Sequence, residues 1–211
     1  MYLTGSRKTP ISIKPFLSRT VKKTLPVHDM TQQNDEQVLI NQLQDEKTRR
    51  QAFEQIVRQY SQPLYWQIRR MVFSHEDAND VLQECFIKAW NNLAQFRGDS
   101  KLSTWLYRIV INETLNFIKR QKEHVSIDSS EANIINQLSS DPYFDGDETA
   151  LQLQEAISKL PEKQRAVFTM KYYEEMKYED MSRILDTSIG ALKASYHHAV
   201  KKISDFFNAT D

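Results

Sequence analysis

Residues 74–90 read SHEDANDVLQECFIKAW, which is the pattern of a helix with its own start signal. The Ser74 oxygen can accept from free N–H groups of the first turn, and the carboxylates of Glu76 and Asp77 suit the positive end of the helix dipole. Apolar residues recur along one side with helical spacing; they are Ala78, Val81, Leu82, Cys85, Phe86, Ala89 and Trp90. The opposite side is polar. The segment therefore predicts a half-buried amphipathic helix.

The sequence on both sides of this helix is also helical in pattern. From residue 35 to about residue 121 apolar side chains follow the i, i+3, i+4 rule, interrupted by a loop at residues 96–100. A long helix is expected from about Leu102 to Lys122. The 211 residues include only 4 glycines and 6 prolines, few for a protein built on tight turns. We therefore expect an all-α fold.

The C-terminal part predicts a helix-turn-helix. Pro161 stands at a helix start. A helix over 178–185, a three-residue turn at 186–188 and a last helix from Ile189 to about Phe207 follow. In this arrangement the second helix can enter the major groove of DNA.

Charge divides the chain into four parts, although its formal net charge is zero. Residues 1–29 are a basic tail, which we expect to be disordered, and Met30 could be the true start. Residues 30–122 form the first helical domain. Residues 123–148 carry seven acids and no Lys or Arg, which is typical of a flexible linker. Residues 149–211 form the second small domain.

Enzyme signatures are missing from the sequence. The four glycines are isolated, so no glycine-rich phosphate loop exists, and no His/Cys cluster has zinc spacing. Cys85, the one cysteine, cannot form an intrachain disulfide and lies in an apolar stripe, where a small buried hydrophobe is expected. The sequence contains no run of about 18 apolar residues, which is the length that a membrane-spanning helix needs. We expect a cytoplasmic protein with no catalytic residue, no cofactor and no metal.

Two helices carry surfaces suited to nucleic acid. Opposite its apolar side, the last helix carries Lys193, His197, His198, Lys201 and Lys202, with Ser188 as its cap. Lysines there would neutralise phosphates, although a merely solvated face is an equal alternative on pattern alone. The long helix from Leu102 presents a stripe that suits a single strand. Its members are Lys101, Trp105, Arg108, Asn112, Asn116 and Lys119. For Trp105 alone a place in the core is favoured.

Several motifs resemble a known family. DANDVLQECFIKAW at 77–90, FRGDS at 96–100 and TWLYRI at 104–109 with Asn112 resemble the first conserved domain of extracytoplasmic-function (ECF) sigma factors. These are the group 4 members of the sigma-70 family, the promoter-recognition subunits of bacterial RNA polymerase. Leu160-Pro161 and SIGALK at 188–193 resemble the second domain, although the family often has Thr-Val-Lys or Thr-Val-Arg after the glycine.

The resemblance implies roles for matched positions. The exposed side of the 75–92 segment would dock on the β′ clamp helices of core polymerase, and the second domain would contact the β flap. The loop from Phe96 would hold a base flipped out of the −10 element, and the long helix would track the non-template strand. The last helix would read the −35 element, and an anti-sigma factor is an expected partner. The polymerase-binding residues would be Asp80, Gln83 and Glu84. The −10 contacts would be Phe96, Arg97, Lys101, Arg108, Asn112, Asn116, Lys119 and Arg120. The −35 contacts would be Ser188, Lys193, Ala194, His197, His198 and Lys201.

Three functions remain as alternatives. A sigma factor accounts for both halves of the chain. A stand-alone helix-turn-helix regulator accounts for the last helix but leaves residues 77–120 without a role. A helical adaptor would show no salt-dependent DNA binding. Binding to core polymerase discriminates among them.

Overall fold

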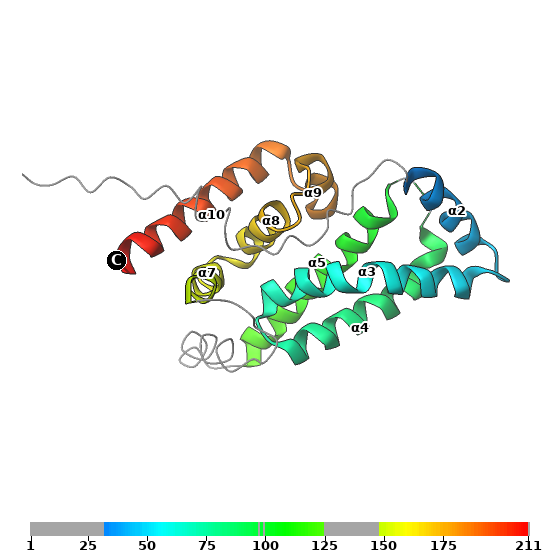
Figure 1. Ribbon diagram of the computed structural model, residues 1–211, viewed down its shortest axis with the longest axis horizontal. Helices are drawn as coiled ribbons and strands as arrows, with labels where there is room; N and C mark the ends of the chain where they lie inside the picture. The colour runs from blue at the N-terminus through cyan, green and yellow to red at the C-terminus, as the bar shows by residue number, and fades with distance from the viewer. Residues whose placement is uncertain (1–31, 97, 99, 125–147, 211) are drawn as a thin grey trace, which may run out of the picture.

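The computed structural model describes residues 32–96, 98, 100–124 and 148–210, and all regular structure in these parts is helical (Figure 1). The basic tail and most of the predicted acidic linker lie outside the described residues. The first group of helices is α2 (Gln32–Gln44), α3 (Arg49–Val72), α4 (His75–Asn92), the short 3₁₀ helix η1 (Leu93–Gln95) and α5 (Leu102–His124). The second group is α7 (Glu148–Ser158), α8 (Glu162–Tyr172), α9 (Tyr178–Leu185) and α10 (Ile189–Thr210).

The first group is a bundle in which α3, α4 and α5 pack against one another. Its start signals work as the sequence predicts: the Ser74 Oγ accepts a hydrogen bond from the Asp77 N–H at 3.2 Å, which caps α4. Ile56, Leu64 and Ile68 of α3 are fully buried in the centre. The predicted all-α class is confirmed.

The second group contains the predicted helix-turn-helix. Asp186 ends α9 with a left-handed φ of 48°, a conformation that short polar side chains tolerate. The Ser188 Oγ then accepts from the Ala191 N–H at 3.3 Å and starts α10. Helix α10 packs against the other helices of this group through its buried residues Leu192, Ala199 and Ile203. The turn thus holds α10 at a fixed angle to α9.

The two groups lie directly against each other. Helix α8 packs on α3 and α5, and α9 packs on α5, so α10 becomes the outermost layer in Figure 1. One apolar cluster runs from the first group into Met170, Met181 and Ile184 of the second. The sequence analysis, which describes two domains joined by a linker, does not predict this contact. The contact forms because apolar side chains of α8 and α9 are buried against the first group of helices.

The apolar stripe of α4 is wider than the core that covers it. Ala78, Val81, Cys85 and Ala89 are buried, as the pattern predicts. Trp90, which the pattern places on the same side, remains 42% exposed. Helical spacing identifies an apolar face but does not say how much of that face neighbouring helices reach.

Candidate polymerase and nucleic-acid interfaces

The polar stripe of α5 lies on the surface of the molecule. Arg108, Asn112, Asn116 and Lys119 are exposed, because the opposite side of the helix is held in the core. That buried side consists of Leu102, Leu106, Val110, Ile111 and Ile118. Two amides and two cations therefore form a continuous row along one exposed side of a rigid helix. Such a row can hydrogen-bond bases and neutralise phosphates of one strand.

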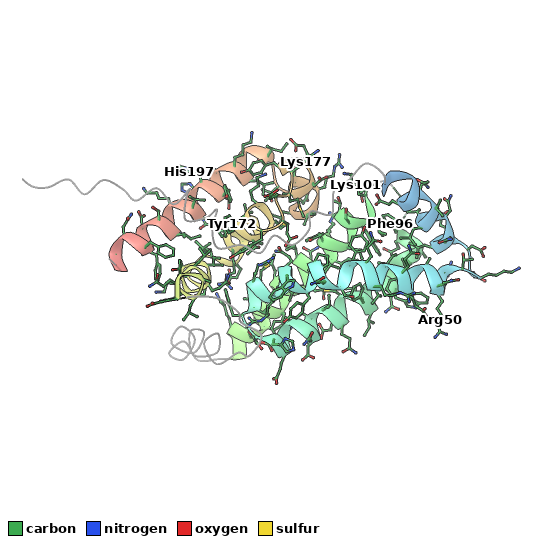
Figure 2. All side chains as sticks on the ribbon, in the orientation of Figure 1. Arg50, Phe96, Lys101, Tyr172, Lys177 and His197 are labelled. Atoms are coloured by element: carbon green, nitrogen blue, oxygen red, sulfur yellow. The ribbon has the colours of Figure 1, made fainter. Side chains whose placement is uncertain are left out.

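The aromatic pair at the start of α5 has a supporting position. Phe96 is only 7% exposed, and its ring centroid lies 5.0 Å from that of Trp105. A DNA contact is predicted for Phe96, but its side chain is buried in the core. The neighbouring ring of Trp105 helps to shield it from solvent. Trp105 is half-buried against the same core, as the sequence favours. Arg97 lies outside the described residues, and Lys101 is half-buried (Figure 2).

Helix α2 fixes the start of α5, which the sequence analysis does not predict. The Glu36 carboxylate accepts a hydrogen bond from the Leu102 backbone N–H, an otherwise open donor of the first turn. Gly98 has a φ of +78°, and a Cβ there would lie 3.9 Å from Ile40 of α2. Space is therefore available at this position, and the left-handed backbone is what favours glycine. A hydrogen bond between residues 66 positions apart has no local signal in the sequence.

An open apolar groove of about 520 Å³ lies between α3 and α4. We call it the α3–α4 groove; it is lined by Phe53, Val57, Ser61, Asn79, Leu82, Gln83, Phe86, Ile87 and Trp90. Ile87 is 55% exposed and Trp90 42%. The Trp90 ring packs edge-on against Phe53, with centroids 5.1 Å apart. Large exposed apolar side chains beside one another indicate a surface for a partner.

Acidic and amide side chains border this groove. Gln83 lies in its wall, and Asp80 and Glu84 are exposed on the same helix. Glu84 lies 3.6 Å from the guanidinium of Arg120 on α5, with both side chains more than half exposed. Arg120, for which a DNA contact is predicted, therefore lies next to Glu84 of α4. A partner helix that carries basic residues would fit an apolar groove with this border.

The outer face of α10 is basic and exposed. Lys193, Ala194, His197, His198 and Lys201 are exposed, as the helical pattern predicts. Figure 2 shows His197 on the side of α10 away from α3 and α5. The Lys193 ammonium lies 5.7 Å from the ring centroid of Tyr178 at the start of α9. Underneath, the rings of Tyr196 and Phe168 stack at 5.9 Å and hold α10 on α8.

Cys85 is chemically inert in this fold. Burial raises the pKa of its thiol to about 12, and the nearby charge of Glu113 adds to this effect. The thiolate, which is the reactive form, is therefore scarce at neutral pH. Among the described residues no group of three or more His, Cys, Asp or Glu side chains could hold a metal ion. Within the same residues, no helix has the length and apolar character needed to cross a membrane.

Comparison with known proteins identifies both halves of the chain. Residues 56–124 match the family description Sigma-70 region 2, and residues 150–203 match Sigma-70, region 4. The chain is 33% identical over 156 residues to the ECF RNA polymerase sigma factor SigW of Bacillus subtilis, across 69% of this chain and 83% of that relative. The chain belongs to the ECF sigma factors of the sigma-70 family. It is also 30% identical over 186 residues to the ECF RNA polymerase sigma-E factor of Escherichia coli, across 83% of this sigma factor and 96% of that one.

Solved structures share the fold. This sigma factor superimposes with a TM-score of 0.61 on the sigma factor RpoE, solved in complex with the anti-sigma factor NepR from Bartonella quintana, at 22% identity over 74% of this chain and 96% of that one. The TM-score is also 0.61 with CnrH, solved in complex with the cytosolic domain of CnrY, at 20% identity over 83% of this chain and 99% of that one. At these identities the likeness concerns the fold.

Proposed function

We propose that this sigma factor docks on core RNA polymerase through the α3–α4 groove, recognises the −10 and −35 promoter elements with α5 and α10, and promotes strand opening. The role is that of a specificity subunit rather than of an enzyme. Because bacterial polymerase works on DNA in the cytoplasm, the proposal places the sigma factor there. The exposed apolar pair Ile87 and Trp90 carries the proposal, since a regulator that only binds DNA has no use for it.

The polymerase contact is assigned to the groove and its acidic border. An amphipathic helix of the β′ clamp would lay its apolar face on Ile87 and Trp90, in the helix-in-groove manner. Asp80 and Glu84 would pair with basic residues beside that face and fix its register. Gln83, in the groove wall, would hydrogen-bond across the contact. The apolar part supplies affinity, and the charged border supplies selection of the partner.

The −10 contact is assigned to the exposed row of α5 and the loop before it. Asn112 and Asn116 can each offer a donor and an acceptor to an unpaired base, which suits reading of the non-template strand. Arg108 and Lys119 lie on the same face, where they would hold the phosphates that join those bases. Phe96, buried under Trp105, would support the loop instead of contacting a base.

The −35 contact is assigned to the N-terminal half of α10. Lys193, Ala194 and His197 lie on its exposed face, and Tyr178 lies close enough to restrict the Lys193 side chain. Ser188 and Lys201 at the two sides, with His198, would reach flanking phosphates. The C-terminal domain would also meet the β flap. Because the structural neighbour RpoE was solved with an anti-sigma factor, we propose such a partner for this chain as well.

The experiment that tests the proposal compares binding to core polymerase with binding to DNA. The double variant Asp80→Asn with Gln83→Ala should lose core binding while keeping its helical content. Glu46→Gln, an exposed acid outside the groove, is the matched control and should bind as the unmodified protein does. If the double variant assembles normally with core polymerase, the docking assignment is wrong. If the unmodified protein binds promoter DNA equally well without core polymerase, a stand-alone regulator is the better description.

A further inference from the structure

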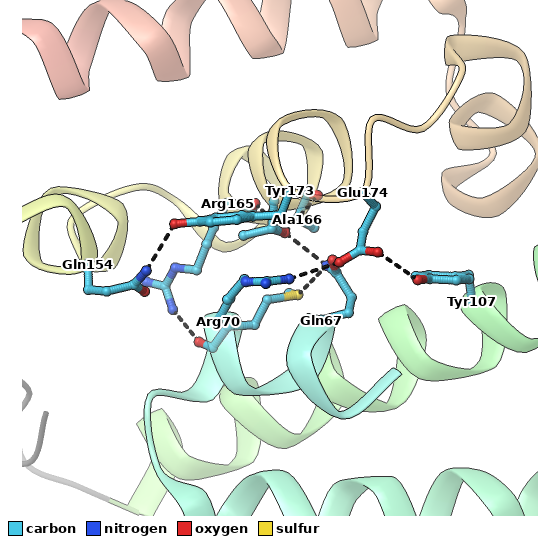
Figure 3. Close-up of polar contacts among 10 residues, drawn as sticks. Gln67, Arg70, Tyr107, Gln154, Arg165, Ala166, Tyr173 and Glu174 are labelled. Carbon is cyan, nitrogen blue, oxygen red and sulfur yellow. Dashed lines mark hydrogen bonds and ion pairs between the residues drawn. The ribbon is translucent and has the colours of Figure 1, made fainter. Parts of the chain in front are cut away.

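Two polar networks join helices of this sigma factor, and they differ in where they end. In the first, the Arg70 Nη1 of α3 donates to the Glu174 Oε1 at 2.8 Å, and the Tyr107 hydroxyl of α5 donates to the other carboxylate oxygen at 3.3 Å (Figure 3). Only 11% of the Arg70 side chain and 8% of the Glu174 side chain is exposed, so this network is closed to a partner. The second network joins α3 to α4 and ends at the surface, in the wall of the α3–α4 groove.

The second network runs through the ring of His75, the first residue of α4. The Tyr65 hydroxyl of α3 lies 2.7 Å from the His75 Nδ1, and the Asn79 Nδ2 lies 3.0 Å from the His75 Nε2. The rings of Tyr65 and His75 also pack edge to face, with centroids 5.8 Å apart. We call these three residues the Tyr65–His75–Asn79 relay. Both ring nitrogens are engaged, and the ring is held by a helix other than its own.

The direction of these hydrogen bonds decides which end of the Asn79 amide faces the groove. A neutral imidazole has one donor nitrogen and one acceptor nitrogen. Because the Asn79 Nδ2 donates to Nε2, the ring proton is on Nδ1, which donates to the Tyr65 oxygen. The Asn79 Oδ1 is the other end of the amide and is therefore turned away from the ring. Since Asn79 is exposed and lines the groove, this acceptor is open to a partner.

Asn79 has no role in the docking proposed above, although it is one of three polar residues that line the groove. The other two are Ser61 and Gln83. The Ser61 hydroxyl donates to the Val57 carbonyl, so its proton is used within α3. Asn79 precedes Gln83 by four residues, so the two amides lie on the same side of α4, one turn apart. The exposed Ile87 lies one turn further along that side.

The surroundings of the Asn79 oxygen favour a donor from the partner. Asp80 follows Asn79 directly, Glu84 lies little more than one turn further along α4, and both are exposed. A carbonyl oxygen beside two carboxylates suits a Lys, Arg or amide N–H donor and disfavours an acceptor. A side chain that is free to rotate loses this freedom when a partner binds, whereas the relay orders Asn79 beforehand. The groove therefore presents a preorganised acceptor at one end.

We propose that Asn79 is a further polymerase-contacting residue and that Tyr65 and His75 are positioning residues, which hold its amide oxygen toward the groove for an N–H donor of the docked polymerase helix. The inference rests on the proposed docking of core polymerase in the α3–α4 groove. Through the relay, α3 contributes to the contact by a side chain that does not itself touch the polymerase.

Binding of core polymerase to the full chain, measured by fluorescence anisotropy, tests the contact. Asn79→Leu keeps the size of the side chain and removes the acceptor, so the Kd should rise about 3- to 30-fold. His75→Phe keeps a ring but leaves the Asn79 amide free to rotate, so the Kd should rise about 2- to 5-fold. Asn41→Leu changes an exposed asparagine of α2 outside the groove and should bind as the unmodified chain does.

The combination of the two changes separates positioning from a merely structural role. His75→Phe together with Asn79→Leu should bind core polymerase as Asn79→Leu alone does, because the ring acts through the amide. Additive losses in the combined variant would overturn the positioning role of His75.

A spectroscopic measurement tests the direction of the relay. Asn79→Asp keeps an acceptor on both sides, so its Kd should lie well below that of Asn79→Leu. Because a carboxylate cannot donate to the ring, NMR of the ring nitrogens should then show a proton on the His75 Nε2, which carries none in the unmodified chain. The chain has 5 histidines, and His75→Phe identifies the signals of this one. Unchanged ring signals in Asn79→Asp would overturn the relay.

The double variant Asp80→Asn with Gln83→Ala distinguishes failure of this inference from failure of the proposed function. Circular dichroism confirms the helical content of each variant first. If the double variant loses core binding while Asn79→Leu binds normally, the docking stands and the role of Asn79 is wrong. If both bind normally, core polymerase does not dock in the groove and both proposals are wrong.

Discussion

Removing the exposed apolar side chains of the α3–α4 groove should weaken core binding by a predictable amount. Ile87 is 55% exposed, so about half of the 1.5–3 kcal/mol available from burying such a side chain, or about 1 kcal/mol, remains for docking. Trp90 is 42% exposed, and about 80 Å² of its surface at 25 cal/mol per Å² adds about 2 kcal/mol. Ile87→Ala with Trp90→Ala should therefore raise the Kd for core polymerase about 150-fold.

Fluorescence anisotropy of the labelled sigma factor, titrated with core polymerase, measures this loss. Val38→Ala is the matched control, since Val38 is also 55% exposed but lies on α2 outside the groove. It should change the Kd less than twofold. Chemical denaturation checks that the groove variant stays folded, because Trp90 also packs on Phe53. Unchanged core binding of the groove variant, or an equal loss with Val38→Ala, would refute the assignment of the groove.

Three other predictions follow from separate parts of the structure. Asn112→Ala should reduce open-complex formation about 5- to 100-fold, as expected for a lost base contact, while −35 duplex binding stays constant in a gel-shift assay. Glu36→Ala should lower the free energy of unfolding by about 1 kcal/mol in urea, as loss of a helix cap does, and slow promoter opening; an unchanged urea midpoint would exclude the capping role. Burial raises the pKa of Glu174 in the folded chain above its ordinary value, against the opposing effects of Arg70 and Tyr107. The folded chain therefore binds this proton more tightly than the unfolded chain, so the free energy of unfolding of the unmodified protein relative to Glu174→Gln should rise as pH falls from 7 toward 5; a relative fall on acidification in urea denaturation would contradict this sign.

Local signals in the sequence were sufficient for most helices. Ser74 marks the start of α4 because its oxygen caps the helix, and capping depends on residues within one turn. The turn at Asp186 and the cap at Ser188 are equally local. The exposed row of α5 follows from spacing alone, since apolar residues occupy the other side of the same helix. Each of these features is encoded within a short stretch.

Features that depend on distant residues could not be predicted in this way. The exposure of Trp90 depends on how far α3 extends over α4, and the burial of Phe96 depends on Trp105. Glu36 reaches α5 only after α2 has packed. The ion pair of Arg70, on α3, with Glu174, in the segment between α8 and α9, spans 104 positions, and neither residue is unusual in its local sequence. Tertiary packing decides these cases, and no local periodicity carries that information.

Start-site mapping with purified components tests the central claim most directly. Core polymerase and the full chain would be combined on genomic fragments, with each component alone as a control. The account predicts transcripts only from the combination, with start sites that share sequence near −10 and −35, and loss of those transcripts with Ile87→Ala and Trp90→Ala together. Absence of any start site, or identical transcripts from core polymerase alone, would contradict it.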